Sequence, residues 1–480
     1  MTTSHSLLAR AAITASLCLI APASAAQAPT PARTSVIEPA PLARPPRAAS
    51  ADPSTDAVRE TPLQRSPPVR ASERPRVVVW TILGLVLLLG LAYAGGHPRV
   101  EAIERSLGIS QAITAGFPFV AIGVAARVSG LLTADTLSLL GPLLRFGLGW
   151  IGFILGFRFN ARLLDTAPRG VGTLVAVRAF ATVTLITGAA ALVRYLTRDT
   201  GDPSVTHDEF LRDALVLGTA GALTSSTTSS HLRTRGADEA SVELVSSALH
   251  LESLAGVVGL LFIASYFRPH DIEVAWHMPG TAWLLLALGL GAAMGAVIYA
   301  VFRQGPATGP GSTVLTLGSV AFASGMAGNL RLSAVVTCFC AGLVLANAPG
   351  EYKPRLTETL DHLERPIYLL FLAVVGALWH PGAWPEWCLM GAFVLARLVG
   401  KSLGTHLGAE RAGVSLSLGA RRELSVAPMG ALPLAIVVSA MLLYPGEPMS
   451  HLVTAILGGA IVTELIVQSV RRPSSGEGAG

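Results

Sequence analysis

From residue 77 onward the chain alternates between long apolar runs and short polar connections. Each run approaches the ~20 residues that an α-helix needs to cross a bilayer. The runs cover residues 77–95, 111–131, 137–157, 171–196, 211–231, 241–267, 281–302, 313–329, 332–348, 364–380, 387–407, 425–445 and 451–470. The pattern predicts an all-α polytopic membrane protein with about 13 transmembrane helices.

Two stretches without this pattern precede the first run. Residues 1–26 have the features of a secretory signal peptide, with Arg10 before a short apolar core and a small-residue cleavage site at Ala23-Ser24-Ala25. Residues 27–75 are rich in Pro, Ala, Arg and Ser and show no apolar periodicity. A segment of that composition cannot bury enough apolar surface to fold, so we expect a disordered extracytoplasmic segment.

Charged residues distinguish two sets of connections. If the first helix starts outside, the odd-numbered connections are rich in Arg, whereas the even-numbered ones are poor in base and often acidic. Because basic loops stay cytoplasmic, this alternation predicts an inner-membrane protein with a periplasmic N-terminus and a cytoplasmic C-terminus. The predicted transmembrane domain covers residues 76–472, and residues 473–480 form a cytoplasmic tail.

Composition supports the membrane assignment and excludes several functions. Hydrophobic residues make up 51% of the chain and charged residues 14%, against roughly 25% charged residues in soluble domains. The Arg residues lie mainly in short loops between apolar runs, where membrane topology explains them, so the net charge of +5 predicts no nucleic-acid partner. Four Cys are too few for a disulfide framework, and Cys338 and Cys340 lack zinc-site spacing. We find no cofactor motif, no metal site and no catalytic constellation, and therefore expect no enzyme.

Ionisable residues near the middle of predicted spans are functional candidates, because each costs about 2.5–3.5 kcal/mol on insertion scales. Glu252 and His250 lie in the sixth span, and Arg397 and Lys401 lie in the eleventh. Lys401 is one of only two lysines among 35 basic residues. A buried lysine can release its proton, whereas an arginine effectively cannot, so position 401 suits a group that exchanges its charge.

Each of these residues also has a structural interpretation. Arg397 or Lys401 could neutralise Glu252 in a static ion pair, and Arg397, four residues before Lys401 on the same helical face, suits a structural cation. Glu252 could be a paired or protonated structural acid rather than a carrier of ions. His250 could titrate, although a lone histidine within a membrane also suits hydrogen-bonded packing.

Two spans contain helix-breaking sequences. Residues 224–230 are seven consecutive Ser and Thr, including the candidate path residues Thr224, Ser225, Ser226 and Thr227. Such hydroxyls compete for backbone hydrogen bonds and favour an unwound, water-lined segment. A second interruption, at 428–433, contains Met429, Gly430 and two prolines. Interrupted spans in both halves of a chain are typical of inverted-repeat transporters with two crossing broken helices; the alternative is a proline kink and ordinary Ser/Thr helix contacts.

These motifs together resemble the sodium/hydrogen exchanger domain of the monovalent cation:proton antiporters, type 2, over roughly residues 80–470. Arg397-Leu398-Val399-Gly400-Lys401 is similar to the Arg-x-x-Gly-Lys helix of that family. Residues 222–227 are similar to its Ser-Ser-Thr unwound helix, residues 429–431 to its Gln-Gly crossing helix, and residues 332–345 and 363–376 to its small-residue span and aromatic-rich helix.

The resemblance implies a homodimer, a scaffold domain, and a mobile core domain that exchanges Na⁺ or K⁺ for protons. It also implies an ion-binding Asp in the helix after the Ser/Thr segment. Here Ser253 occupies that position and Glu252 precedes it, while Met429 replaces the Gln of the Gln-Gly pair. One residue along a helix is a rotation of about 100°, so Glu252 and Ser253 point in different directions.

The leading hypothesis is exchange of a monovalent cation for protons in the lipid bilayer. Glu252 would carry the ion or proton, Lys401 would be its charge partner, and Ser225, Ser226, Thr227 and Ser253 would line the path. A second hypothesis is a transport-silent relative that acts as a membrane scaffold or sensor, which the missing Asp supports. A third is transport of another solute such as an anion, which the charge of Lys401 permits if Glu252 stays protonated.

Overall fold

A computed structural model describes residues 116–129, 140–159, 167–197, 207–234, 236–268, 278–304, 310–350, 352–379, 384–444 and 447–471, together with residues 90 and 382. The predicted signal peptide, the Pro/Ala-rich segment, nearly all of the first span and the C-terminal tail lie outside the described residues. The described residues belong to one compact unit of the chain, residues 58–480.

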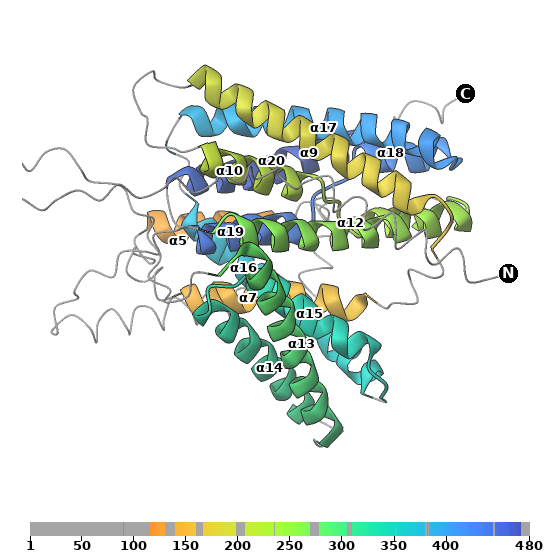
Figure 1. Ribbon diagram of the computed structural model, residues 1–480. Coiled ribbons are helices and arrows are strands. Elements are labelled where there is room, and N and C mark those ends of the chain that lie inside the picture. The colour runs from red at the N-terminus through yellow and green to blue at the C-terminus, as the bar shows by residue number, and fades with distance from the viewer. Residues whose placement is uncertain are drawn as a thin grey trace, which may run out of the picture. The chain divides into compact units, whose positions relative to one another are not determined.

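All regular secondary structure in the described part is α-helical (Figure 1). The helices are α5 (Phe117–Val128), α7 (Gly141–Arg158), α9 (Val171–Thr197), α10 (His207–Gly221), α11 (Thr227–Thr234), α12 (Glu239–Tyr266), α13 (Gly280–Gln304), α14 (Pro310–Asn329), α15 (Ala334–Asn347), α16 (Lys353–Leu378), α17 (Trp384–Ala412), α18 (Leu418–Ser425), α19 (Ala431–Leu443) and α20 (Glu447–Arg471). The predicted all-α class is confirmed.

Five of these helices are long and apolar enough to cross a membrane: α9, α12, α13, α17 and α20. Each of them coincides with a predicted span, whereas the total of about 13 spans stays a prediction. The predicted helices at 313–329 and 332–348 are separate, as α14 and α15. The backbone turns between them at Arg331, a non-glycine residue with positive φ (51°).

Helix α16 begins earlier than the predicted span 364–380, at Lys353. Its first half is highly charged, which is why the apolar pattern does not reveal it. Arg158 at the end of α7 donates to Glu364 at 2.7 and 3.1 Å and to Asp361 at 2.9 Å. These ion pairs therefore hold the charged first half of α16 against the end of α7, in a part of α16 that lies outside its apolar run.

Three of the described helices begin at a side-chain cap. The Asp238 carboxylate accepts the backbone N–H of Ser241 at 2.9 Å at the start of α12. Ser333 and Ser417 cap α15 and α18 in the same way. Each cap satisfies a backbone donor that has no partner within its own helix.

Several pairs of helices pack closely through glycine, among them α5 with α16, α7 with α15, and α9 with α17. A Cβ on Gly152 of α7 would meet the Val335 carbonyl of α15, and a Cβ on Gly376 of α16 would meet the Val120 carbonyl of α5. Small residues at such contacts let membrane helices approach backbone to backbone. The α9–α17 pair, side by side in Figure 1, positions the site described next.

Candidate functional site

Two predicted spans are broken helices that meet at their interruptions. Helix α10 ends at Gly221 and α11 begins at Thr227, while α18 ends at Ser425 and α19 begins at Ala431. The backbone N–H of Ser225 donates to the carbonyl of Pro428 at 2.9 Å, joining the two interruptions. A Cβ on Gly430 would lie 3.3 Å from the Cα of Ser225, so the extended segments cross in close contact.

The local sequence explains both breaks. Within the first, the Ser225 and Thr227 hydroxyls are 3.0 Å apart, and the Ser229 hydroxyl donates to the Ser226 carbonyl at 2.9 Å. Side-chain hydrogen bonds of this kind offer the backbone an alternative to the helical pattern. In the second, Pro428 lacks an N–H and Gly430 is extended (φ −96°, ψ −163°).

Arg397, on α17, binds both interruptions at once. Its guanidinium donates to the carbonyls of Gly221 (3.1 Å), Leu223 (3.0 Å) and Ala427 (3.1 Å). These carbonyls lie at the C-terminal ends of α10 and α18, where helix dipoles favour a cation. The side chain is fully buried. The hydrogen-bond donors of Arg397 therefore bind carbonyls and not Glu252, in contrast to the predicted alternative of an ion pair between the two residues.

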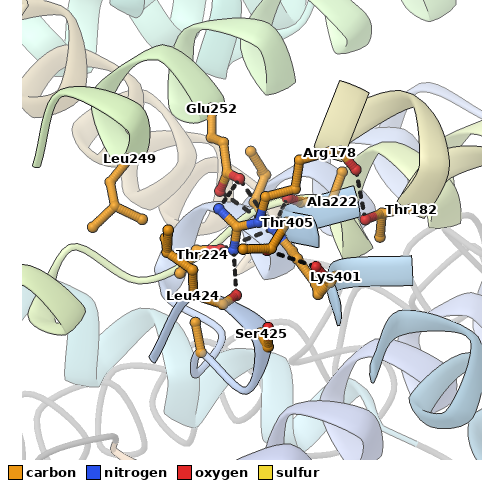
Figure 2. A network of polar contacts seen from close by, with 12 residues as sticks. Arg178, Thr182, Ala222, Thr224, Leu249, Glu252, Lys401, Thr405, Leu424 and Ser425 are labelled. Carbon is orange, nitrogen blue, oxygen red and sulfur yellow. Dashed lines mark hydrogen bonds and ion pairs between the residues drawn. The ribbon is translucent and has the colours of Figure 1, made fainter. Parts of the chain in front are cut away.

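Glu252 and Lys401 face each other beside this crossing (Figure 2). Glu252 comes from α12 and Lys401 from α17, and their exposed fractions are 1% and 0%. The Lys401 Nζ lies 3.2 Å from Oε2 and 3.3 Å from Oε1 of Glu252. It also donates to the Thr224 hydroxyl at 2.8 Å and to the Ala222 carbonyl. Four oxygens from two segments, α12 and the interruption between α10 and α11, thus surround one ammonium group.

Arg178 also belongs to this cluster, although it is not among the predicted site residues. This α9 residue is 1% exposed and donates to Glu252 Oε1 at 2.5 Å and to the Leu424 carbonyl at 2.6 Å. A third contact reaches the Thr224 hydroxyl at 3.3 Å. One signal in the sequence points to it, because Arg178 is a charge within an apolar run.

The remaining predicted site residues do not contact Glu252 in the structure. The Ser253 hydroxyl donates to the Leu249 carbonyl at 3.0 Å, and His250 Nδ1 lies 2.7 Å from the Ser246 carbonyl, both on α12 itself. Ser226 and Thr227 are exposed, and Met429 packs partly buried against the apolar core. Of the predicted path hydroxyls, only that of Thr224 touches the charged cluster.

Together, the two crossing broken helices and the buried ion cluster define an all-α, multi-pass membrane transporter. The family model for the transmembrane sodium/hydrogen exchanger matches residues 105–471, and the chain belongs to this family. The predicted family resemblance is confirmed, and a member of this family is a transporter rather than an enzyme.

Solved structures agree with this fold. The chain is similar to the sodium/proton antiporter MjNhaP1 from Methanocaldococcus jannaschii at pH 8, with a TM-score of 0.57 and 15% identity over 81% of this chain and 97% of that one. An electron-microscopy structure of the same antiporter matches with a TM-score of 0.54 and 15% identity over 80% and 95% of the two chains. At this identity the likeness concerns the fold alone. Among curated proteins, none matches the chain.

Proposed function

We propose that this protein exchanges a monovalent cation, Na⁺ or K⁺, for protons, with Glu252 and Lys401 at the centre of the exchange. The observation that carries the proposal is the contact of 3.2 Å between a buried carboxylate and a buried ammonium at the crossing of two broken helices. Ionisable groups at such depth are costly and mark ion or proton pathways in membrane proteins. Membership of the exchanger family supports the same chemistry.

The contacts of Lys401 suggest how exchange works. Its ammonium occupies a position surrounded by carboxylate, hydroxyl and carbonyl oxygens. In transporters, unwound carbonyls and half-helix ends are the groups that coordinate Na⁺ or a proton. A cation and the Lys401 ammonium would therefore compete for the same oxygens. The cation can bind only when the ammonium loses its proton or moves away.

We further propose an inner-membrane location with the N-terminus periplasmic and the C-terminus cytoplasmic. The alternation of basic and acidic connections supports this orientation. The family resemblance supports a homodimer with a mobile core domain. Labelling of single cysteines placed in the connections, with a thiol reagent that cannot cross the membrane, tests the orientation.

The function is tested by exchange in proteoliposomes loaded with a pH-sensitive dye, with Li⁺, Na⁺ and K⁺ added in turn. We expect Glu252→Gln to abolish cation-driven pH changes, because a neutral amide attracts neither a cation nor the Lys401 ammonium. Glu464→Gln is the matched control: Glu464 is another buried acid, but its described contact is with Gln468 on its own helix. Wild-type exchange rates in Glu252→Gln would remove Glu252 from the mechanism.

A second candidate function is a transport-silent scaffold or sensor. It is favoured by the double pairing of Glu252 with Arg178 and Lys401 and by the Ser253 hydroxyl, which bonds within its own helix. If both ion pairs of Glu252 were permanent, the site could not bind or release an ion, and the protein would not transport. Absence of cation-driven pH change with all three cations, in protein that remains folded, would support this function and exclude the first.

A further inference from the structure

The described helices form two groups that pack mainly among themselves. The site helices carry the buried ion cluster and comprise α9, α10, α11, α12, α17, α18, α19 and α20. The supporting helices are α5, α7, α13, α14, α15 and α16. Between the groups, α19 packs against α7 and α15, and α12 packs against α13 and α15. Packed helices at such an interface can slide past one another in a conformational change.

The crossing of the broken helices is closed on one side and accessible on the other. On one side α10 packs against α19, and residues Leu432 to Met441 of α19 are all buried. On the other side α11 packs against α18, and Ser226, Thr227 and Ser230 are exposed. Unwound backbone at membrane depth is tolerated only within protein or beside water. Water therefore reaches the interruption from the α11–α18 side, whereas the α10–α19 side is closed.

On the closed side, Arg268 joins the site helices to the turn between α14 and α15, residues 330–333. Arg268 follows the end of α12, and its Nη2 donates to the carbonyls of Leu330 at 3.1 Å and Arg331 at 3.0 Å. Its guanidinium carbon also lies 3.3 Å from the centre of the Trp283 ring on α13, a cation–π contact. All of these partners belong to the supporting helices.

The α14–α15 turn has a defined backbone that presents the two carbonyls. The N–H of Leu332 donates to the Ala327 carbonyl at 2.8 Å, and that of Arg331 donates to the Gly328 carbonyl at 3.2 Å. This is the Schellman pattern of a helix C-terminus, in which the residue with positive φ is usually glycine; here it is Arg331. The C-terminal end of α14 carries partial negative charge, which favours the Arg268 cation.

A second contact holds α19 against the same turn. The hydroxyls of Ser333 and Ser439 lie 2.9 Å apart, and both residues are buried. Ser333 is the N-cap of α15, and Ser439 lies on α19 about two turns beyond its start. One short turn of the supporting helices therefore holds both α12 and α19.

These contacts are suited to release. Arg268 Nη1 is buried without a hydrogen-bond partner among the described residues, so the guanidinium would gain hydrogen bonds on reaching water. Ser333 still caps α15 when Ser439 departs. Within each group, by contrast, glycine brings helix backbones into contact, as at Gly152 and Gly404. The two groups therefore separate from each other more easily than the helices within a group.

We propose that the α14–α15 turn is a latch that holds Arg268 and Ser439 and so keeps the α10–α19 side of the crossing closed. When the latch releases, α12 and α19 move away from the turn, and an ion can reach the crossing from that side. The inference rests on the proposed function, because it takes the crossing as the place where the ion binds. The state of the latch can nevertheless be measured without transport.

Access to a buried cysteine measures that state. Ala435 lies four residues before Ser439, on the same face of α19, and its exposed fraction is 0%. Ala435→Cys is introduced into a chain whose four native cysteines are replaced by alanine, and is labelled in lipid nanodiscs with a charged, water-soluble thiol reagent. We expect slow labelling while the latch is intact. Ser230→Cys, at an exposed position on the α11–α18 side, should be labelled quickly and controls for the reagent.

Two variants break the latch at different points. Arg268→Ala removes both hydrogen bonds to the turn, and Ser439→Ala removes the contact with Ser333. Both should speed the labelling of Ala435→Cys. We expect an increase of about 10–100-fold in Arg268→Ala, because hydrogen bonds from a charged group are stronger than neutral ones, and a smaller increase in Ser439→Ala.

Matched controls remove similar contacts that do not join the two groups. Arg194→Ala loses an aromatic stacking contact within the site helices, and Ser324→Ala loses a hydrogen bond within α14. Neither should change the labelling rate. An unchanged rate in Arg268→Ala and Ser439→Ala, or an equal increase in the controls, would overturn the latch. If Arg268→Ala does not fold, Ser439→Ala decides alone, because it removes a single oxygen atom.

A disulfide in place of the second contact tests whether the latch must open during exchange. Ser333→Cys and Ser439→Cys are combined in the same cysteine-free chain, and a mild oxidant joins the two thiols. We expect the oxidised protein to lose exchange in proteoliposomes and a reductant to restore it. Undiminished exchange by protein with the disulfide formed would overturn the latch. Absence of exchange in the reduced variant and in wild type would instead refute the proposed function, while the labelling result would still decide the latch.

Discussion

The contact between α9 and α17 allows a sharp test of how helix packing controls the site. A Cβ on Gly404 would lie 2.7 Å from the Cα of Arg178 and 3.1 Å from its carbonyl oxygen. Carbon atoms in proteins approach to about 3.5–4.0 Å, so Gly404→Ala must separate the two backbones by about 1 Å. Gly400, one turn earlier, is similarly close to Thr182, with a Cβ contact of 2.8 Å to its Cα, and the helices have little freedom to rotate.

The expected magnitude follows from two opposing terms. Overpacking of this kind costs typically about 1–3 kcal/mol, and the higher helix propensity of Ala returns about 1 kcal/mol. The net loss of stability is therefore about 0–2 kcal/mol, and the protein should still fold. Function is more sensitive, because a displacement of about 1 Å can lower the rate at a preorganised site ~100-fold. We expect Gly404→Ala to exchange about 10–100 times more slowly than wild type.

Exchange in proteoliposomes and thermal unfolding in detergent measure the two effects separately. Gly391→Ala is the matched control, because it makes the same substitution on the same helix at a position where a Cβ has no neighbour within 4 Å. It should exchange at the wild-type rate and unfold at the same temperature or slightly above. Exchange at the wild-type rate in Gly404→Ala would refute the idea that this contact positions Arg178 and Lys401 around Glu252.

Two further predictions concern stability. Arg397→Leu removes the donor that binds three carbonyls. Since each unpaired group costs about 1–3 kcal/mol, we expect the free energy of unfolding to fall by about 3 kcal/mol or more, measured by thermal unfolding. The control is Arg411→Leu, at an exposed position on the same helix, which should change stability by less than about 0.5 kcal/mol. The hydrogen bond from Ser241 lowers the pKa of the exposed Asp238 carboxylate, so its stabilising effect is complete above the pKa of an unfolded Asp, about 4, and is lost only as the pH falls below that. The difference in unfolding temperature between wild type and Asp238→Ala should therefore stay constant from about pH 5 to pH 8, and a difference that changes across this range would contradict the assignment.

The two helix breaks could be predicted from the sequence because their causes are local. Seven consecutive hydroxyl residues, and a proline followed closely by a glycine, disfavour a continuous helix whatever surrounds them. The long apolar helices were found for the same reason, since length and hydrophobicity are read directly from the chain. The charged first half of α16 was missed because it lies outside any apolar run. Its helical structure is supported by contacts with Arg158 that the sequence does not display.

The partners of Arg178, by contrast, could not be predicted from the sequence. Its span was predicted, but which residues of other helices it meets depends on how α9 rotates against α17 and α12. Close packing at Gly404 fixes that rotation, and a single sequence does not say which partner a glycine contacts. The same limit applies to Ser253, which was predicted to line the path. In the regular helix α12 it lies about 100° from Glu252 and bonds to Leu249 instead.

The distribution of basic residues at the crossing gives the strongest reason to connect Lys401 with proton transfer. The chain uses arginine for nearly all of its 35 basic residues, and at the crossing Arg178 and Arg397 bind carbonyls and a carboxylate with their several donors. An arginine at position 401 would equally supply a positive charge and hydrogen bonds to the oxygens there. Charge balance alone therefore does not require a lysine. What a lysine adds is the ability to become neutral in place, and among the three basic residues of the crossing only Lys401 has it.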